Sequence, residues 1–307
     1  MQGEPAHVSI RVADVERIAA LGWRGLDEAT LGDWLLRAAD GFTGRANSAL
    51  VLGPRPQADG WLPRLVRWYA DRGLPPMVQI PLPGGEEIDA ILDQAGWRTH
   101  DMVRFLTGDL AEVQRLTDQL LGGLLANRHA PAESTPCQGR PGSDLSDPSA
   151  QGALHSAGSN VITRLDPEPD EAWLAAYHYR GAPLPGHARD VLVRAGDGTR
   201  LCFASLRVPA EDGTAEPVLA VARGAVAQDW LGVTAVTVGD RHRRQGHATR
   251  LMSDLATWAA EYGAEAIYLQ VAADNDPALR LYSRLGFHHH HDYRYRVGPV
   301  PKEEGSA

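Results

Sequence analysis

The feature that most constrains this chain is the order of elements between residues 231 and 287, where a basic turn lies between regular elements. Residues 231–238, LGVTAVTV, are rich in β-branched side chains and predict a strand buried on both faces. From Leu251 to Tyr262, apolar residues recur at steps of three and four, which predicts a helix that stops at Gly263. The chain is therefore expected to be an α/β protein.

The turn between this strand and helix, RHRRQGHATR at 241–250, contains four arginines and two histidines in a chain of formal net charge -9. Such a run either follows the phosphates of a nucleic acid or holds one compact anion. The first N–H groups of a helix are unpaired and bind phosphate oxygens directly, and Gly246 and Ala248 leave space for such a ligand. A solvated turn that only caps the helix is the alternative.

A second strand and a short helix follow. Residues 264–271 alternate in the manner of a strand, and Asn275 stands where that strand ends. Pro277 occupies the first helical turn, where proline is tolerated, and Gly286 ends the helix. The apolar residues between them have helical spacing, and they are Ala278, Leu281, Tyr282 and Leu285. The order is thus strand, anion-binding turn, helix, strand, short helix.

These residues resemble the GNAT family of acyl-CoA-dependent N-acyltransferases. The family signature of Arg or Gln, two residues, Gly, one residue, then Gly or Ala stands at 243–248. Its second signature, an Asn before a helix that ends in Leu-Tyr-x-x-x-Gly-Phe, stands at Asn275 and 281–287. The firm match covers residues 230–297 and a looser one reaches back to 160. The resemblance implies tandem GNAT folds of the two-lobed type familiar from actinobacteria, each a mixed, mostly antiparallel sheet flanked by helices.

The resemblance also implies a cofactor site, with acetyl-CoA as the acyl donor and no metal. The strand that carries Val236 and Val238 is expected to separate from its neighbour near the turn, so that its exposed backbone pairs with the pantetheine arm. The diphosphate would lie on the N–H groups of residues 244–249. The cofactor-binding residues implied in this way are Val236, Val238, Arg243, Arg244, Gln245, Gly246, His247, Ala248, Thr249 and Asn275.

Transfer of an acetyl group from a thioester to an amine needs a base for the amine and benefits from an acid at the departing sulfur. The family motif implies Tyr282 as the acid, with a core aromatic residue as the alternative. The strand at 230–238 contains no acidic residue. Asp229 precedes it and could act as the base or shape a hairpin turn. His178 and a water-mediated route are the other candidates for removing the amine proton.

Three residues are predicted to contact the acceptor. Arg45 and Asn47, in FTGRANS, could line a cleft between two lobes or cap a loop. Tyr177 lies in DEAWLAAYHYRG, a region that often lines the acceptor pocket in GNAT proteins. Its alternative role is helix packing, together with Trp173 and Tyr179.

The histidine run and the cysteines give no metal prediction. Successive residues of a strand point to opposite faces, so His288 to His291 would not converge on one ion and are expected at a strand edge. Cys137 and Cys202 are too few for a disulfide framework or a metal cluster.

The chain is predicted to contain two lobes. Residues 128–160 contain no aromatic or β-branched aliphatic residue, which predicts a flexible linker. The predicted division is a degenerate GNAT-like lobe at 1–108, a connecting segment at 109–158 whose flexible part is about 128–158, and the acetyl-CoA-binding lobe at 159–307.

The two lobes are expected to have arisen by duplication. Residues 61–82 predict a helix and a strand, and 86–106 predict a short helix, a glycine and a strand pair. In an alignment with the C-terminal lobe, Gly96 corresponds to Gly286, Trp97 to Phe287, and Leu92 to Tyr282. Nothing before Trp61 resembles the cofactor turn, so the first lobe is expected to support the fold and form one wall of the acceptor cleft.

Together these observations predict an N-acetyltransferase that moves acetyl directly from acetyl-CoA to the primary amine of a small molecule. A protein or peptide N-acetyltransferase and a non-catalytic acyl-CoA sensor are the alternatives. The net charge of -9 disfavours a nucleic-acid partner, and no apolar run has the length of a membrane span. The start of the sequence lacks a targeting pattern, so a cytoplasmic location is expected. The sequence leaves the oligomeric state open.

Overall fold

A computed structural model of the chain describes residues 10–57, 60–129, 161–179, 181–209 and 216–299. The first half contains, in chain order, α1 (Val12–Gly22), β1 (Asp27–Leu31), β2 (Trp34–Ala38), the 3-10 helix η1 (Arg45–Asn47), β3 (Ala49–Leu50), α2 (Trp61–Ala70), β4 (Met77–Leu82), α3 (Glu86–Gln94), β5 (Arg98–Asp109) and α4 (Leu110–His129).

The second half has the same kinds of element in nearly the same order. It contains β6 (Ile162–Asp166), α5 (Glu171–Ala176), α6 (Ala188–Val193), β7 (Arg200–Arg207), β8 (Val218–Ala227), β9 (Trp230–Val238), the 3-10 helix η2 (Asp240–His242), α7 (His247–Glu261), β10 (Ala266–Ala272), α8 (Asp276–Arg284) and β11 (His288–Val297). The predicted strands at 231–238 and 264–271 and the helices that follow them are therefore confirmed.

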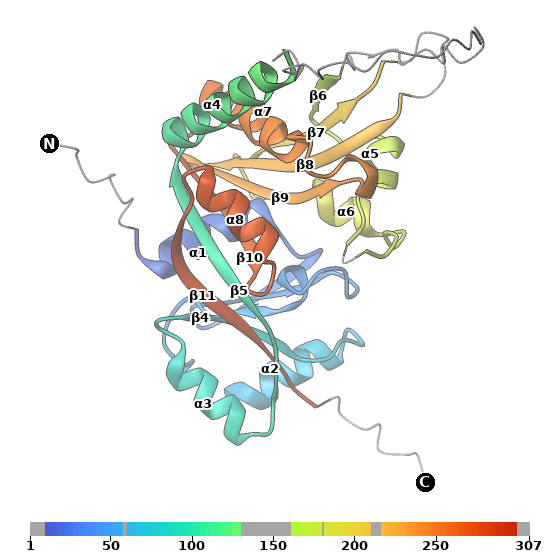
Figure 1. Cartoon of the computed structure of the whole chain (residues 1–307). Coiled ribbons are helices and arrows are strands. Elements are labelled where there is room, and N and C mark those ends of the chain that lie inside the picture. Colours follow the sequence, from blue (N-terminus) through green and yellow to red (C-terminus); the bar gives the residue numbers. More distant parts are fainter. Residues whose placement is uncertain (1–9, 58–59, 130–160, 180, 210–215, 300–307) are drawn as a thin grey trace, which may run out of the picture.

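The strands form one mixed sheet that runs through both lobes, in the order β1-β2-β3-β4-β11-β5-β10-β9-β8-β7-β6. Figure 1 shows the long strands β5 and β11 side by side in the middle of the molecule, where they connect the two lobes. The prediction of a mixed, mostly antiparallel sheet flanked by helices is confirmed.

The two lobes repeat one backbone arrangement. In each, a helix connects two parallel strands, α2 between β3 and β4 and α7 between β9 and β10. The short helices that follow also end alike, since the amide of Trp97 donates to the carbonyl of Leu92 at 2.9 Å and that of Phe287 to Tyr282 at 3.0 Å. The backbone thus supports the predicted alignment, in which Leu92 occupies the place of Tyr282.

The lobes exchange their last strands. β5, from the first half, pairs with β10, and β11, from the second half, pairs with β4. The two exchanged strands also pair with each other, from His288 opposite Thr107 to Val297 opposite Arg98. Because of this exchange, the lobes cannot separate without breaking the sheet.

The predicted strand pair after Gly96 is wrong. Residues 98–109 form the single strand β5, and its pairing with β11 continues on both sides of Asp101. Asp101 has a φ of 26° and is skipped in the register. It is a bulge within one strand, which a sequence pattern does not distinguish from a turn between two strands.

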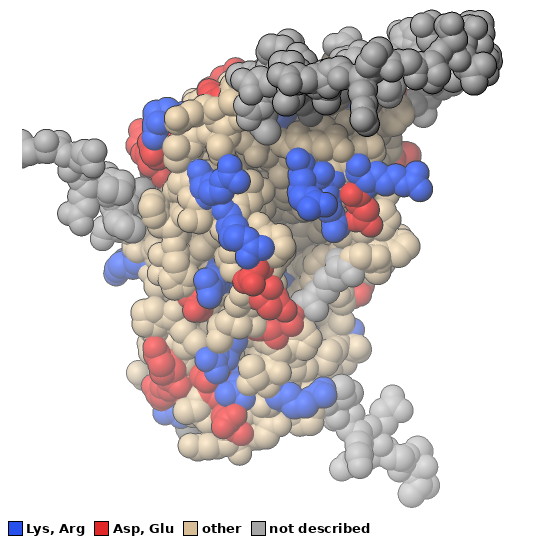
Figure 2. Space-filling view, viewed as in Figure 1, with Lys and Arg blue, Asp and Glu red and all other residues tan. Residues whose placement is uncertain are grey.

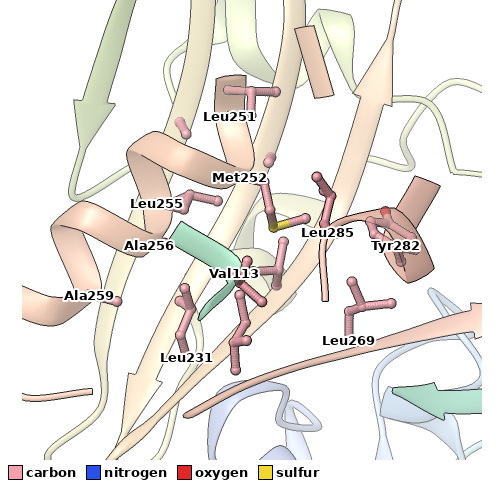
Figure 3. Packing of buried hydrophobic residues seen from close by; sticks show 14 of the residues in the cluster. Val113, Leu231, Leu251, Met252, Leu255, Ala256, Ala259, Leu269, Tyr282 and Leu285 are labelled. Atoms are coloured by element: carbon pink, nitrogen blue, oxygen red, sulfur yellow. The ribbon is translucent and has the colours of Figure 1, made fainter. Parts of the chain in front are cut away.

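The core of the second lobe lies between the sheet and α7, with α4 packed beside them. Leu255 of α7, Leu231 of β9 and Val113 of α4 are completely buried in one cluster (Figure 3). Burial of each such side chain contributes about 1.5–3 kcal/mol to folding. This packing fixes the start of α7 relative to the end of β9, which is where the cofactor turn lies.

The histidine run lies within a strand, as predicted, but the expectation of a strand edge is wrong. β11 has β4 on one side and β5 on the other, so it is an interior strand. His291 is 1% exposed, and its Nε2 lies 3.0 Å from Oε1 of the equally buried Glu16. Among the described residues, no group of three or more potential ligands could hold a metal ion.

Within the described ranges, no helix has both the length and the apolar character required to cross a membrane. Residues 110–129 of the predicted connecting segment form α4, and the predicted linker that follows lies outside the described residues. The lobe boundaries at 108 and 159 remain predictions.

Candidate active site

The parallel strands β9 and β10 separate partway along their length. They are paired from Trp230 opposite Ala266 to Val233 opposite Leu269, and no further pairs follow although both strands continue. Beyond this point β9 stays paired with β8, and Ala235 has a φ of 55° at a bulge in that ladder. The separation expected near Val236 is present, and it leaves one edge of β9 without a neighbouring strand.

A cavity of about 280 Å³ occupies this separation. It lies between β9, β10, the start of α8, the end of α5 and the 3-10 helix η1 of the other lobe. Its lining residues are Arg45, Tyr177, His178, Tyr179, Val233, Thr234, Ala235, Val236, Thr237, Leu269, Gln270, Val271, Ala272, Asn275, Ala278 and Tyr282. Both lobes therefore contribute side chains to one opening.

The basic turn between β9 and α7 has an unusual backbone. Arg244 and Gly246 both have positive φ, 60° and 86°, and Gly246 is the N-cap of α7 without a side-chain cap. Turns of this kind direct successive N–H groups to one side and bind anions. A left-handed arginine is strained by about 1–3 kcal/mol, and such strain is concentrated at functional sites. The turn fits the diphosphate of an acyl-CoA.

The other predicted residues of the turn surround it. The guanidinium of Arg243 is 2.7 Å from Asp240 and exposed, and Nε2 of Gln245 donates to the carbonyl of Arg241 at 3.2 Å. His247, Ala248 and Thr249 form the first turn of α7. Figure 2 shows arginine side chains, in blue, around a hollow in the upper half of this face of the molecule. Val238, by contrast, pairs with Ala220 at the end of β9 and does not line the cavity.

Tyr282 and Asn275 lie on the α8 side of the opening. Tyr282 is 7% exposed and packs at the edge of the second lobe's core, beside Leu285 (Figure 3). Burial raises the pKa of Tyr282 to about 12, so its phenol keeps its proton at neutral pH. The side chain of Asn275 accepts from the amide of Ala278 at 3.3 Å and thereby caps α8. Asn275 orders this wall of the cavity.

His178 is well placed for base chemistry. It follows the end of α5, lines the cavity and is exposed. Its Nδ1 lies 3.3 Å from the carbonyl oxygen of Ala176. A carbonyl only accepts, so this contact places a proton on Nδ1, and in the neutral imidazole the lone pair is then on Nε2. Tyr177, predicted as a substrate residue, lines the same wall, and burial raises its pKa to about 12.

Two predicted site residues lie elsewhere. Asp229 is in the turn between β8 and β9, and its carbonyl accepts from Glu265 and Ala266. It is at the end of β9 farthest from the cofactor turn, about 20 Å along the strand from Val236. The structure therefore favours the turn-forming role of Asp229.

Asn47 is 5% exposed, and its side chain forms hydrogen bonds with the backbone of the loop that precedes it. Its Oδ1 accepts from the amides of Ala39 and Gly41, and its Nδ2 donates to the carbonyls of Phe42 and Thr43. With its side chain satisfied by backbone, Asn47 shapes the loop and does not line the cavity, in contrast to its predicted substrate role. The neighbouring Arg45 does line it.

Gln270 is a site residue that sequence reasoning missed. Its Oε1 accepts from Nη1 of Arg45 at 3.0 Å and from the hydroxyl of Tyr293 at 2.9 Å. The three residues come from η1, β10 and β11, so the contact joins the two lobes at the cavity wall. No local pattern in the sequence could indicate a contact between residues 225 positions apart.

Comparison with known proteins assigns this arrangement to a family. The sequence model described as "Probable histone acetyltransferase Rv0428c C-terminal" matches residues 9–123 and 148–296. The chain belongs to this family. It is 28% identical over 283 residues to the probable histone acetyltransferase Rv0428c of Mycobacterium tuberculosis, across 92% of this chain and 72% of that protein. It is 23% identical over 291 residues to the uncharacterized N-acetyltransferase YobR of Bacillus subtilis, across 93% of this chain and 98% of that one.

Solved structures agree on the fold. A GCN5-related N-acetyltransferase from Kribbella flavida matches with a TM-score of 0.56 at 17% identity, over 94% of this chain and 93% of that chain. A tandem GNAT protein from the clavulanic acid biosynthesis pathway matches with a TM-score of 0.55 at 14% identity, over 99% and 92%. This member of the family is thus an acetyltransferase of the GNAT type with a tandem fold.

Proposed function

We propose that this GNAT protein transfers the acetyl group of acetyl-CoA directly to the primary amine of a small molecule. The observation that supports this proposal best is the cavity at the separation of β9 and β10, which is walled by Arg45 from one lobe and by Tyr282 from the other. An acceptor that reaches β9 has protein on both sides. Walls on two sides suit a small molecule better than a segment of a folded protein.

Acetyl-CoA would supply the thioester that is cleaved, and the residues present suit its binding. The amides of the turn at 244–249 would bind the diphosphate, and the unpaired edge of β9 around Val236 would bind the pantetheine amides in the manner of an added strand. The exposed Arg243 would add charge-assisted hydrogen bonds at the rim.

Two side chains of the cavity, His178 and Tyr282, would each carry out one proton transfer. Nε2 of His178 would accept the proton of the attacking amine, directly or through one water, as the new N–C bond forms. The phenol of Tyr282 would give its proton to the sulfur as the C–S bond breaks. In its neutral form His178 has the lone pair on Nε2, and burial keeps the proton on the phenol of Tyr282.

The test is a thiol-release assay with acetyl-CoA and a panel of amines, amino acids, aminoglycosides and peptides. In Tyr282→Phe, we expect kcat to fall by about 10² or more, the usual contribution of a general acid, while the KM for acetyl-CoA changes little. Tyr262→Phe is the matched control, because Tyr262 is 44% exposed on the far end of α7. A non-catalytic sensor would bind acetyl-CoA and release no thiol with any amine.

The same panel separates small molecules from proteins as acceptors. The printed names of two relatives mention histones and N-alpha-acetylation, and those names describe these relatives only. If a lysine-rich peptide or a peptide N-terminus were the best acceptor, the small-molecule part of the proposal would be wrong. We place the reaction in the cytoplasm, where acyl-CoA is available, and we expect neither nucleic acid nor membrane to take part.

A further inference from the structure

The acceptor side of the cavity carries positive charge that no acidic side chain in its described lining neutralises. Among the described residues that line the cavity, Arg45 is the one permanent cation and none is acidic. Asp274 and Asp276, which flank Asn275, are exposed and lie outside the lining. A simple amine in its ammonium form would therefore be repelled by the wall that it must approach.

Arg45 is held in place by contacts that leave most of its hydrogen-bonding capacity unused. Its Nη1 donates to Oε1 of Gln270 at 3.0 Å, and its guanidinium carbon lies 4.8 Å from the centre of the Trp23 ring. No carboxylate of the described residues forms an ion pair with it. A guanidinium has five N–H donors, so a planar anion in the cavity could still accept from it.

A buried guanidinium nearby strengthens this positive field. Arg223 of β8 is 0% exposed, and its guanidinium carbon lies 5.0 Å from the same ring of Trp23. Its Nε donates to the carbonyl of Leu192 at 2.7 Å, whereas its Nη1 has no hydrogen-bond partner among the described residues. Burial lowers the pKa of Arg223 to about 10, which still leaves it charged at neutral pH.

We infer that the acceptor of this enzyme carries an anionic group, a carboxylate or a phosphate, close to its primary amine, and that Arg45 binds this group. The inference rests on the proposed function and narrows its substrate class. One arginine then serves two purposes. It attracts and orients the acceptor, and its charge lowers the pKa of the nearby ammonium, so that more of the amine is in the neutral form that attacks.

The same electrostatics disfavours cationic protein tails. A lysine side chain has no anion near its amine, and a basic tail would bring further cations toward Arg45. Free amino acids and amines that carry a phosphate have the required pair of groups within a few bonds. Comparing matched amines distinguishes a carboxylate from a phosphate as the source of this negative charge.

The test compares matched amines. We expect kcat/KM to be at least about tenfold higher for free amino acids than for their carboxamides, the scale of a charge-assisted hydrogen bond. The amine of a carboxamide is less basic than that of the free amino acid, so a larger fraction of it is unprotonated and able to attack. A higher kcat/KM for the free amino acid must therefore come from the protein. Ethanolamine phosphate compared with ethanolamine tests the phosphate in the same way.

Arg45→Gln should abolish this preference, and Arg45→Lys should keep part of it. Arg55→Gln is the control, since Arg55 lies in the same lobe away from the cavity, with its Nε 3.7 Å from Glu87. A thermal shift with CoA shows whether each variant is folded. If Arg45→Gln is folded by this measure and still prefers anionic amines as strongly as the wild type does, the inference is wrong.

The outcomes also separate this inference from the proposed function. If neutral amines or lysine peptides are acetylated as fast as their anionic counterparts, the inference is wrong and the acetyltransferase activity stands. If acetyl-CoA binds and no amine is acetylated, both are wrong.

Discussion

Gly60 and Gly246 hold the same left-handed backbone at the N-caps of equivalent helices, with φ and ψ of 73° and 26° before α2 and of 86° and 2° before α7. Neither helix has a side-chain cap. The chemistry around them differs, since Gly246 follows a run of arginines and Gly60 does not, and Pro63 removes one amide from the first turn of α2. The first lobe has the same conformation at this N-cap without the charges around it.

This equivalence provides a matched pair of substitutions. Gly246→Ala should destabilise the fold by about 1–2 kcal/mol, because a side chain is strained in this conformation, and should also weaken CoA binding about tenfold or more. Gly60→Ala should have a similar effect on stability and none on CoA. Urea unfolding and calorimetric titration with CoA measure the two effects. Equal losses of CoA affinity in both variants would contradict the assignment of the cofactor turn.

Local sequence was sufficient for the backbone of the predicted cofactor half of the site. The turn at 241–250, the strand end at Asn275 and the helical position of Tyr282 depend on residues within a few positions of each other, so local patterns predict them. In the acceptor half, the sequence named Arg45 and Tyr177, which line the cavity, but it gave no indication of the contacts that hold Arg45. The contact between Arg45 and Gln270 depends on the exchange of β5 and β11, which fixes the position of one lobe relative to the other. This exchange gives no periodic pattern in the sequence.

The base can be identified by comparing two of the candidates named from sequence. His178→Gln should lower kcat by about 10² or more, since it removes the one imidazole in the lining, whereas Asp229→Asn should change kcat less than about twofold. Steady-state kinetics with the best amine of the panel measures both. If kcat were unchanged in both variants, the proton would leave through a water-mediated route that needs neither side chain.

Gln270→Leu should separate the positioning of Arg45 from its charge. The substitution removes the acceptor that Arg45 and the 2% exposed Tyr293 share, so we expect a loss of about 1–3 kcal/mol in the free energy of unfolding. The KM for the amine should rise more than kcat falls, because Gln270 holds Arg45 and does not touch the reacting atoms. Gln114→Leu, at a partly exposed glutamine on α4 whose hydrogen bond to Thr257 lies at the surface, should cost less than Gln270→Leu. A fall in kcat alone would contradict the positioning role.

His290 should make the stability of the fold depend on pH. Its Nε2 lies 2.9 Å from the carbonyl oxygen of Ile10, which only accepts, so this nitrogen carries a proton, and its Nδ1 lies 2.8 Å from Nδ1 of His291. Burial lowers the pKa of His290 below its ordinary value, although the Ile10 carbonyl opposes this. A histidine of this kind binds its proton more tightly in the unfolded chain than in the folded one.

The sign of the effect follows from that difference. The contribution of His290 is fully present above the unfolded pKa of about 6.5 and is lost as the pH falls toward the lower folded value. Urea unfolding between about pH 7.5 and 5 should therefore show stability falling with pH, with a smaller slope in His290→Asn. His100→Asn is the control, because the side chain of His100 is 48% exposed, and it should change the slope less than His290→Asn does. Stability that rises on acidification, or a slope in His290→Asn equal to that of the wild type, would contradict this assignment.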